Sequence, residues 1–244
     1  MLVITHFNED FPAKEKRQIL FLHGYLCSGK CFYNQLFYFE RYYDCFAPTL
    51  TGFDGGSVMQ KPYSLDDYIS EVKEYMSVNK IIKPIVVAHS FGARIAVKMA
   101  GERYRESEPF SKIILTGPAG LKPRFSIKKF VKKTVYKAVK NKLSESQKEK
   151  FYSADYKVLS PVMKKSFNLI IGEHLEDSAK RICVPTLIIE GALDNETPLY
   201  QARRYNRLIE NSKLFTIDGA GHFAFLDAVG KFNARMLDFI ENNC

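Results

Sequence analysis

The sequence lacks several features that would place it outside the ordinary globular proteins. Its longest uninterrupted apolar runs, such as 85–88, have the length of a strand and fall far short of the roughly 18 to 20 residues that cross a bilayer. The N-terminus has no basic leader and meets Glu9 and Asp10 early, so we expect no export signal and a cytoplasmic protein. With 46% hydrophobic and 26% charged residues in 244, the composition predicts a packed fold.

Cysteine is scarce and does not follow a metal-site pattern. The five cysteines are odd in number, scattered, and free of C-x-x-C pairs. Cys27 and Cys31 lie one helical turn apart, but no second Cys/His pair is spaced to complete a metal site with them. We therefore expect free thiols in a reducing compartment, no metal and no cofactor.

Excess charge is absent from most of the chain. The formal net charge is +9, yet residues 121–150 hold eleven Lys/Arg against two Glu, so the other 214 residues carry 25 of each sign. A nucleic-acid-binding protein spreads basic residues over a docking face, so we expect no nucleic-acid partner. Apolar residues recur every four positions from Ile127 to Val139 between lysines, which predicts an amphipathic cationic helix. Its lysines either face solvent or attract an anionic substrate or an anionic membrane surface.

Short β-branched runs alternate with amphipathic stretches, which predicts a mostly parallel sheet with helices on both faces. The expected strands are 2–7, 18–22, 43–47, 85–88, 112–116, 186–190 and 213–217. The expected helices are 29–41, 65–79, 91–105, 199–209 and 230–241. Ser64 and Asp67 form a plausible capping pair at the start of the second helix.

The strand pattern stops between residues 119 and 181. What remains there is the basic helix, a linker at 153–160 and a helical stretch at 161–175. The sequence therefore predicts an α/β core domain, 1–119 and 182–244, with a helical lid inserted at 120–181.

A serine lies where a predicted strand turns sharply into a predicted helix, in the letters A-H-S-F-G at 88–92. This arrangement is a nucleophile elbow, whose strained dihedral angles expose the serine Oγ and require small residues two before and two after it. Ala88 and Gly92 meet that requirement. The helix N-terminus also favours negative charge beside Ser90, which is the predicted nucleophile.

A serine hydroxyl is a weak nucleophile and needs a histidine base with a carboxylate behind it. Where a serine occupies such an elbow, the acid and then the histidine follow it along the chain. His174 lies in the predicted lid, where an exposed or capping role fits it, whereas His222 lies in a glycine-rich loop after the last predicted strand. His222 is the predicted base, and activity should rise through neutral pH because a free histidine titrates near about 6.5.

The predicted acid is Asp194. It follows the strand at 186–190 and so lies at the carboxyl edge of the sheet, where open α/β sheets form their sites. The preceding strand ends in a loop, 116–120, that holds no carboxylate. Weaker candidates for the acid are Glu196, Asp218 and Asp227.

The tetrahedral intermediate of acyl transfer needs two backbone N–H donors for its oxyanion. One donor is predicted at Phe91, directly after the nucleophile. The other is predicted at Tyr25, in the His-Gly loop after the strand at 18–22, where Gly24 lets the backbone approach. His23 and His89 are interpreted as structural histidines.

Taken together, these marks resemble the α/β-hydrolase superfamily across residues 19–227. The matching segments are His23-Gly24, the turn at 50–57, the Ser90 elbow, 184–186, Asp194 and 221–223. Ala88 stands where the family has a glycine, and Thr49 stands where an Asp often precedes the turn. The resemblance implies an α/β-hydrolase fold with a lid over the strand edges that shapes an acyl or alcohol pocket.

A serine nucleophile predicts a hydrolase of a small to medium carboxylic ester or thioester that works through an acyl-enzyme, with the lysines favouring an anionic ester. By analogy with the family, Ser in place of Asp disfavours haloalkane dehalogenases and epoxide hydrolases. Apolar lid residues that could line the pocket are Phe125, Phe130, Tyr136, Phe151, Tyr152, Tyr156, Met163 and Phe167.

Four alternatives stay open from the sequence. Three are enzymes: a hydrolase of carbon–carbon bonds in diketone or ring-cleavage products, a cofactor-free perhydrolase, and a lipase-like acyl hydrolase at anionic membranes. The fourth is a ligand-binding receptor on a hydrolase fold, since fold does not fix function.

Overall fold

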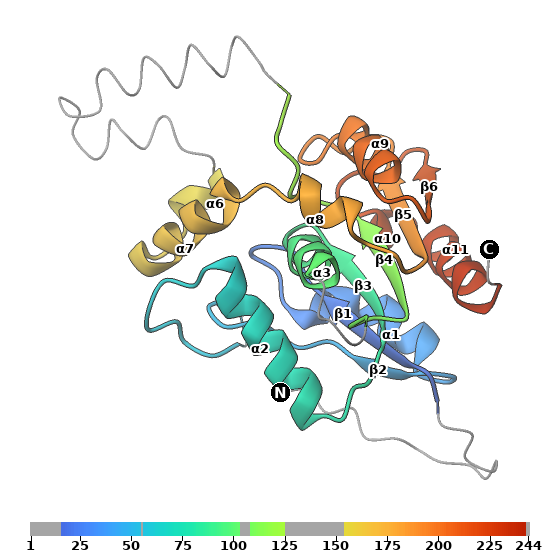
Figure 1. The fold of residues 1–244 in the computed structure, drawn as a ribbon, viewed down its shortest axis with the longest axis horizontal. Coiled ribbons are helices and arrows are strands. Elements are labelled where there is room, and N and C mark those ends of the chain that lie inside the picture. Colours follow the sequence, from blue (N-terminus) through green and yellow to red (C-terminus); the bar gives the residue numbers. More distant parts are fainter. Residues whose placement is uncertain (1–15, 55, 103–107, 125–153, 243–244) are drawn as a thin grey trace.

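A six-stranded parallel sheet forms the centre of the structure (Figure 1). The computed structural model describes residues 16–54, 56–102, 108–124 and 154–242. The strands are β1 (Gln18–Leu22), β2 (Asp44–Phe46), β3 (Ile85–His89), β4 (Lys112–Thr116), β5 (Thr186–Gly191) and β6 (Ser212–Ile217). Their order in the sheet is β2-β1-β3-β4-β5-β6, and every neighbouring pair is parallel. The carboxyl ends of all six strands therefore meet at one edge.

Helices cover both faces of this sheet (Figure 1). One face packs against α2 (Leu65–Val78), α3 (Phe91–Gly101), α8 (Glu176–Lys180) and α9 (Leu199–Leu208), and the other against α1 (Tyr33–Phe39), α10 (Ala224–Asp227) and α11 (Val229–Glu241). The central strand β3 is buried on both sides, which explains why its sequence is a continuous apolar run rather than an alternation.

Between β4 and β5 the described chain is helical. It forms α6 (Ala154–Lys157), α7 (Pro161–Gly172) and α8, without a strand among the described residues of this stretch. Helix α7 is fixed to the loop before α2, because the Ser166 hydroxyl accepts a hydrogen bond from Tyr63 N at 2.6 Å. The arrangement agrees with the predicted lid, although the proposed domain boundaries stay a prediction.

The predicted elements are confirmed to within a few residues wherever the structure describes them. The expected helix 29–41 is a 3-10 helix, Gly29–Phe32, followed by α1, and the expected linker 153–160 contains α6. The helical stretch 161–175 ends earlier, at Gly172, so His174 lies exposed in a loop. The capping box is present: Asp67 N donates to Ser64 Oγ and Ser64 N donates to Asp67 Oδ2.

Two predictions lie outside the described residues. These are the strand at 2–7 and most of the basic helix of 121–150, together with the lid residues Phe125, Phe130, Tyr136, Phe151 and Tyr152. Within the described part of the chain, no helix is both long enough and apolar enough to span a membrane.

Candidate active site

Ser90 occupies a strained turn between β3 and α3. Its backbone has φ 49° and ψ −102°, outside the common allowed regions for a side-chain-bearing residue. Its N–H donates to Thr116 O at 3.1 Å, which ties the turn to the end of β4. A Cβ at Gly92 would lie 2.2 Å from Leu22 O, so the small residue predicted two positions after the serine is a steric requirement. The elbow inferred from the sequence is present.

Asp194 and His222 meet at the carboxyl edge of the sheet. His222 Nδ1 lies 2.7 Å from Asp194 Oδ2, with Asp194 following β5 and His222 following β6. Burial alone would raise the pKa of Asp194, but hydrogen bonds from His222 and Thr197 outweigh it and hold that pKa well below its usual range. Asp194 is therefore ionised, and its partner nitrogen is the one that carries the imidazole proton.

Two glycines, Gly191 and Gly117, let the backbone approach the loop of the histidine closely. A Cβ at Gly191 would lie 2.1 Å from Gly221 O, and a Cβ at Gly117 would lie 2.9 Å from His222 Nδ1. Gly117 also has φ +52°, a conformation that glycine adopts without strain. The backbone therefore brings 191, 221 and 117 close enough for the side chains of residues 194 and 222 to meet.

Thr197 supports the pair of Asp194 and His222, although it was not predicted from the sequence. Its N–H donates to Asp194 Oδ1 at 2.9 Å, and its hydroxyl donates to Asp194 Oδ2 at 2.8 Å and lies 3.2 Å from His222 Nδ1. Glu196 contributes its backbone N–H to the same carboxylate rather than acting as the acid. The signal in the sequence was the D-x-x-T spacing, which is typical of an Asp side chain that caps its own turn.

The loop predicted to supply an oxyanion donor lies beside Ser90. A Cβ at Gly24 would lie 3.5 Å from the Ser90 Cβ and 2.8 Å from His89 Cδ2, so only glycine allows this approach. The Tyr25 ring packs edge-on against the Phe91 ring, with 5.4 Å between the ring centroids. The two predicted donor residues therefore lie next to each other. Their roles as N–H donors stay a prediction.

His23 is structural, as the sequence suggested. Its Nδ1 donates to Gly24 O at 2.8 Å and its Nε2 accepts from Leu50 N at 3.1 Å. Burial lowers the pKa of His23 to about 4, so the ring is neutral and fixes one tautomer. It thereby ties the turn at 50–57 to the loop that carries Tyr25. Thr49, the departure from the family pattern, accepts from Gly29 N at 3.0 Å.

His89 is buried beneath the site. Its Nδ1 donates to Thr116 O at 3.1 Å, its ring centroid lies 4.6 Å from that of His222, and burial lowers its pKa to about 3. Its Nε2 has no hydrogen-bond partner among the described residues. A neutral ring that packs against His222 supports the structural interpretation.

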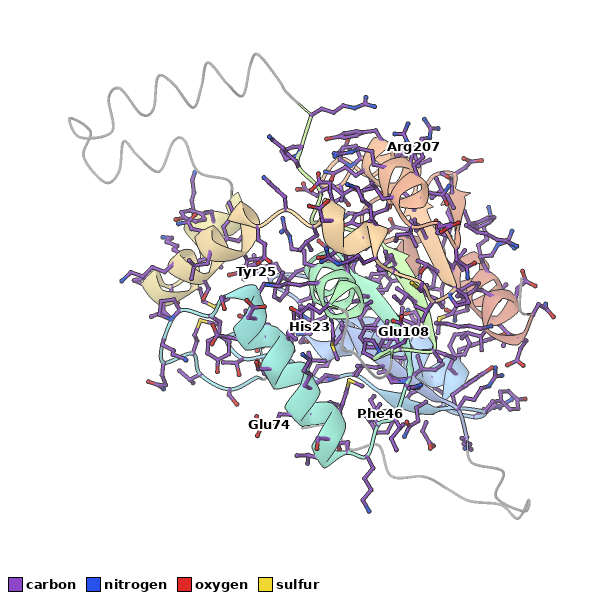
Figure 2. All side chains as sticks on the ribbon, in the orientation of Figure 1. His23, Tyr25, Phe46, Glu74, Glu108 and Arg207 are labelled. Carbon is purple, nitrogen blue, oxygen red and sulfur yellow. The ribbon has the colours of Figure 1, made fainter. Side chains whose placement is uncertain are left out.

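Tyr25 connects the site to the lid. Tyr25 is labelled in Figure 2. Its hydroxyl donates to Met163 O on α7 at 3.2 Å, and its ring centroid lies 4.9 Å from that of Phe53 and 5.2 Å from that of Phe167. Phe167 in turn contacts Tyr156 at 5.6 Å. Of the predicted pocket-lining residues that the structure describes, Met163 and Phe167 therefore contact the Tyr25 side chain, and Tyr156 packs against Phe167.

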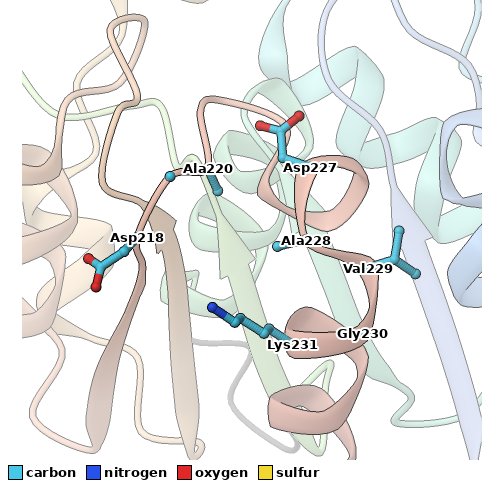
Figure 3. Close-up of a pocket in the computed structure, with 8 residues that line it drawn as sticks. Asp218, Ala220, Asp227, Ala228, Val229, Gly230 and Lys231 are labelled. Atoms are coloured by element: carbon cyan, nitrogen blue, oxygen red, sulfur yellow. The ribbon is translucent and has the colours of Figure 1, made fainter.

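The weaker candidates lie elsewhere. Asp218 is exposed, and Asp227 Oδ2 accepts a hydrogen bond from Gly221 N at 2.7 Å, which supports the loop of His222. Both line an open hollow of about 460 Å³ at the start of α11, which Lys231 also borders (Figure 3). Ser90, Asp194 and His222 do not line this hollow.

One contact of the predicted site is not seen among the described residues. None of the hydrogen bonds in the described part of the chain joins Ser90 Oγ to His222, so that contact stays a prediction; such bonds often tighten only with substrate. Among the same described residues, no group of three or more His, Cys, Asp or Glu side chains is arranged to hold a metal ion.

The chain belongs to the alpha/beta hydrolase family, whose model matches residues 19–235. A relative from Bacillus subtilis strain 168, the AB hydrolase superfamily protein YisY, is 26% identical over 97% of this chain and 95% of its own.

Solved structures share the fold. An esterase from Exiguobacterium antarcticum superposes with a TM-score of 0.74 at 21% identity, covering 93% of this chain and 92% of its own. A meta-cleavage product hydrolase from Pseudomonas fluorescens IP01 superposes with a TM-score of 0.68 at 20% identity, covering 93% and 91%.

Proposed function

We propose that this protein is a serine hydrolase that cleaves a small to medium carboxylic ester or thioester through an acyl-enzyme, with Ser90, Asp194 and His222 as its triad. The observation that carries the proposal is the 2.7 Å hydrogen bond between His222 Nδ1 and Asp194 Oδ2 at the same sheet edge as the strained Ser90 turn. An ionised Asp194 holds the proton on Nδ1 and leaves Nε2 free to act as the base.

In the proposed cycle His222 Nε2 takes the proton of Ser90 Oγ as the oxygen attacks the carbonyl carbon. The N–H groups of Tyr25 and Phe91 stabilise the oxyanion of the tetrahedral intermediate. His222 then gives the proton to the leaving alcohol or thiol, and the same base activates the water that releases the acid and restores Ser90.

The side chains around Tyr25 support an apolar acyl group. Phe53, Phe91 and Phe167 all pack edge-on against its ring. An anionic ester, which the lysine-rich sequence at 121–150 favours, is therefore proposed to keep its charge outside this cluster.

A series of p-nitrophenyl esters of increasing acyl length tests this function. The wild-type protein should hydrolyse the short and medium esters, and Ser90→Ala should lower kcat by about 10⁴-fold or more without unfolding the protein. Ser111→Ala, which changes an exposed serine, is the matched control and should keep wild-type kinetics. Ester hydrolysis that survives in Ser90→Ala contradicts the proposal.

A carbon–carbon bond hydrolase is the second candidate. The structural likeness to a meta-cleavage product hydrolase favours it, because that protein shares the fold over nearly the whole chain. The same triad would serve either reaction, so the substrate decides between them. Vinylogous diketones assayed beside the simple esters separate the two: hydrolysis of the diketones alone would replace the ester assignment.

A further inference from the structure

Exposed apolar side chains lie on three loops of the proposed site. Leu26, Leu193 and Phe223 are 44%, 62% and 36% exposed, and each is one residue away from a predicted oxyanion donor, the acid or the base. None of the three takes part in the proposed cycle. Exposed apolar side chains around a reactive centre are typical of a surface that binds apolar parts of a ligand.

Phe223 is the one of these that ring contacts hold beside the site. Its ring centroid lies 4.9 Å from that of His89, 5.4 Å from that of His222 and 6.0 Å from that of Phe225. The buried His89 also packs against His222, with 4.6 Å between the ring centroids, and a Cβ at Gly24 would lie 2.8 Å from His89 Cδ2. His89 therefore packs beneath Phe223, the base and the loop of Gly24 together.

Phe223 and Tyr25 lie on opposite faces of the sheet. Tyr25 packs against the core that the sheet forms with α2 and α3, whereas Phe225, which contacts Phe223, belongs to the core that the sheet forms with α1 and α11. Ser90 lies at the edge of the sheet, between β3 and α3. An ester bound at Ser90 therefore has an aromatic side chain available to each of its two halves.

The hydrogen bond between Asp194 and His222 indicates which half reaches Phe223. Because Nδ1 of His222 lies 2.7 Å from Asp194 Oδ2, Nε2 is the atom that protonates the leaving oxygen. That oxygen must come within about 3 Å of Nε2, so a leaving group of several carbon atoms extends past His222 toward Phe223. Burial lowers the pKa of His89 to about 3, so the ring beneath Phe223 is uncharged at neutral pH.

We propose that Phe223 is a specificity-determining residue that binds the leaving group, and that the preferred substrate is an ester of an uncharged aromatic alcohol. The exposed ring of Phe223 supplies apolar contact area and an edge or face for stacking. This inference rests on the proposed function and narrows it to one class of leaving group. Phe223 acts during acylation, when the alcohol is still bound, and has no effect on the hydrolysis of the acyl-enzyme, from which the alcohol has departed.

Two esters with the same acyl group, benzyl butyrate and 2-methoxyethyl butyrate, test the inference. The wild type should hydrolyse the benzyl ester with a kcat/KM about 10-fold or more above that of the methoxyethyl ester. Phe223→Ala should bring this ratio down to about 1, and Phe223→Leu, which keeps a smaller apolar side chain, should lower it by about threefold. The ratio is the decisive quantity, because a displaced His222 would slow both esters alike and leave the ratio unchanged.

Phe37→Ala is the matched control, since Phe37 lies on α1 with 68% of its surface exposed, and it should keep the wild-type ratio. Fluorophosphonate labelling of Ser90 expels only fluoride, so Phe223→Ala should label as fast as the wild type. If the wild type labels at Ser90 but has a ratio near 1, or if Phe223→Ala keeps the wild-type ratio, the role of Phe223 is overturned and the proposed function stands. A wild type that neither labels at Ser90 nor hydrolyses either ester overturns the proposed function and this inference with it.

Discussion

The Asp194 carboxylate accepts four hydrogen bonds, from the N–H groups of Glu196 and Thr197, the Thr197 hydroxyl and His222 Nδ1. Three of these hydrogen bonds come from its own turn, so the turn orients the carboxylate independently of the histidine. Burial would raise the pKa of Asp194, but His222 and then Thr197 lower it well below its usual range, so the carboxylate keeps its negative charge behind the imidazole at neutral pH.

Asp194→Asn tests that role. An amide nitrogen facing His222 Nδ1 favours the wrong tautomer, so kcat should fall by about 10⁴-fold while the fold is retained. Asp218→Asn, in an exposed weaker candidate, is the matched control and should keep wild-type kcat. Steady-state kinetics on one ester with circular dichroism of each variant provide the measurement, and equal kcat values in both variants would remove Asp194 from the mechanism.

Glu190 is a second buried carboxyl near the first. Its side chain is fully buried, neither oxygen has a hydrogen-bond partner among the described residues, and burial together with the charge of Asp194 raises its pKa to about 9. In the folded protein Glu190 therefore keeps a proton that it loses in the unfolded chain, where the ordinary pKa of a glutamate is about 4.3. Between those two pH values, folding stability contributed by Glu190 falls as pH rises.

Glu190→Gln should therefore leave the stability unchanged at pH 4. As the pH rises toward 9, the variant should become increasingly more stable than the wild type. At pH 8 we expect a rise in Tm of about 5 °C, since about 2–4 °C corresponds to 1 kcal/mol in a domain of this size. The exposed Glu210→Gln is the control and should show no such trend. Thermal melts from pH 4 to 9 measure the effect, and a flat difference between Glu190→Gln and wild type contradicts it.

At the scale of elements, the site depends on close backbone contacts at the ends of strands. Helix α3 can begin at Phe91, directly after Ser90, only because Gly92 passes Leu22 O, where a Cβ would come within 2.2 Å of the oxygen. The obstacle is backbone of the central sheet, so it cannot move aside as a side chain would.

Gly92→Ala should accordingly destabilise the protein by about 3 kcal/mol, lowering Tm by about 6–12 °C. Gly172→Ala, at the end of α7, is the matched control: no atom lies within 4 Å of the position that a Cβ would take there, so Tm should stay the same or rise slightly. Differential scanning calorimetry compares the two, and similar melting temperatures would show that the elbow tolerates a methyl group.

Much of this arrangement could be predicted from the sequence because the strands are short apolar runs with clear boundaries. The bounds of β1 and β4 are those expected, and the order of serine, acid and histidine led to a bonded pair at 194 and 222. Thr197 and Glu190 could not be found in this way. The role of Thr197 depends on how its turn folds back onto Asp194, and the role of Glu190 depends on its burial. Neither property follows from the local periodicity of the sequence.

At the scale of the whole molecule, charge is concentrated in one segment. The chain outside residues 121–150 carries equal numbers of basic and acidic residues, so the whole net charge of +9 comes from that segment, and we propose that it attracts an anionic substrate. The aromatic side chains packed around Tyr25 carry no charge.

The salt dependence of catalysis tests whether this charge guides the substrate. For an ester with a free carboxylate, kcat/KM should fall by about threefold or more between low salt and 0.3 M, because screening shortens the range of the attraction to below about 10 Å. The corresponding neutral methyl ester is the control and should be nearly insensitive. If kcat/KM depends on salt equally for the two esters, the lysines do not attract the substrate.

The central claim is that Ser90 is an activated nucleophile whose base is His222. Mapping the adduct of a fluorophosphonate probe measures this most directly, because the probe reacts covalently only where a serine is activated. The account predicts one adduct, on Ser90, no adduct in Ser90→Ala, and labelling slowed by about 10³-fold or more in His222→Ala. An adduct on any other residue, or an undiminished labelling rate in His222→Ala, contradicts it.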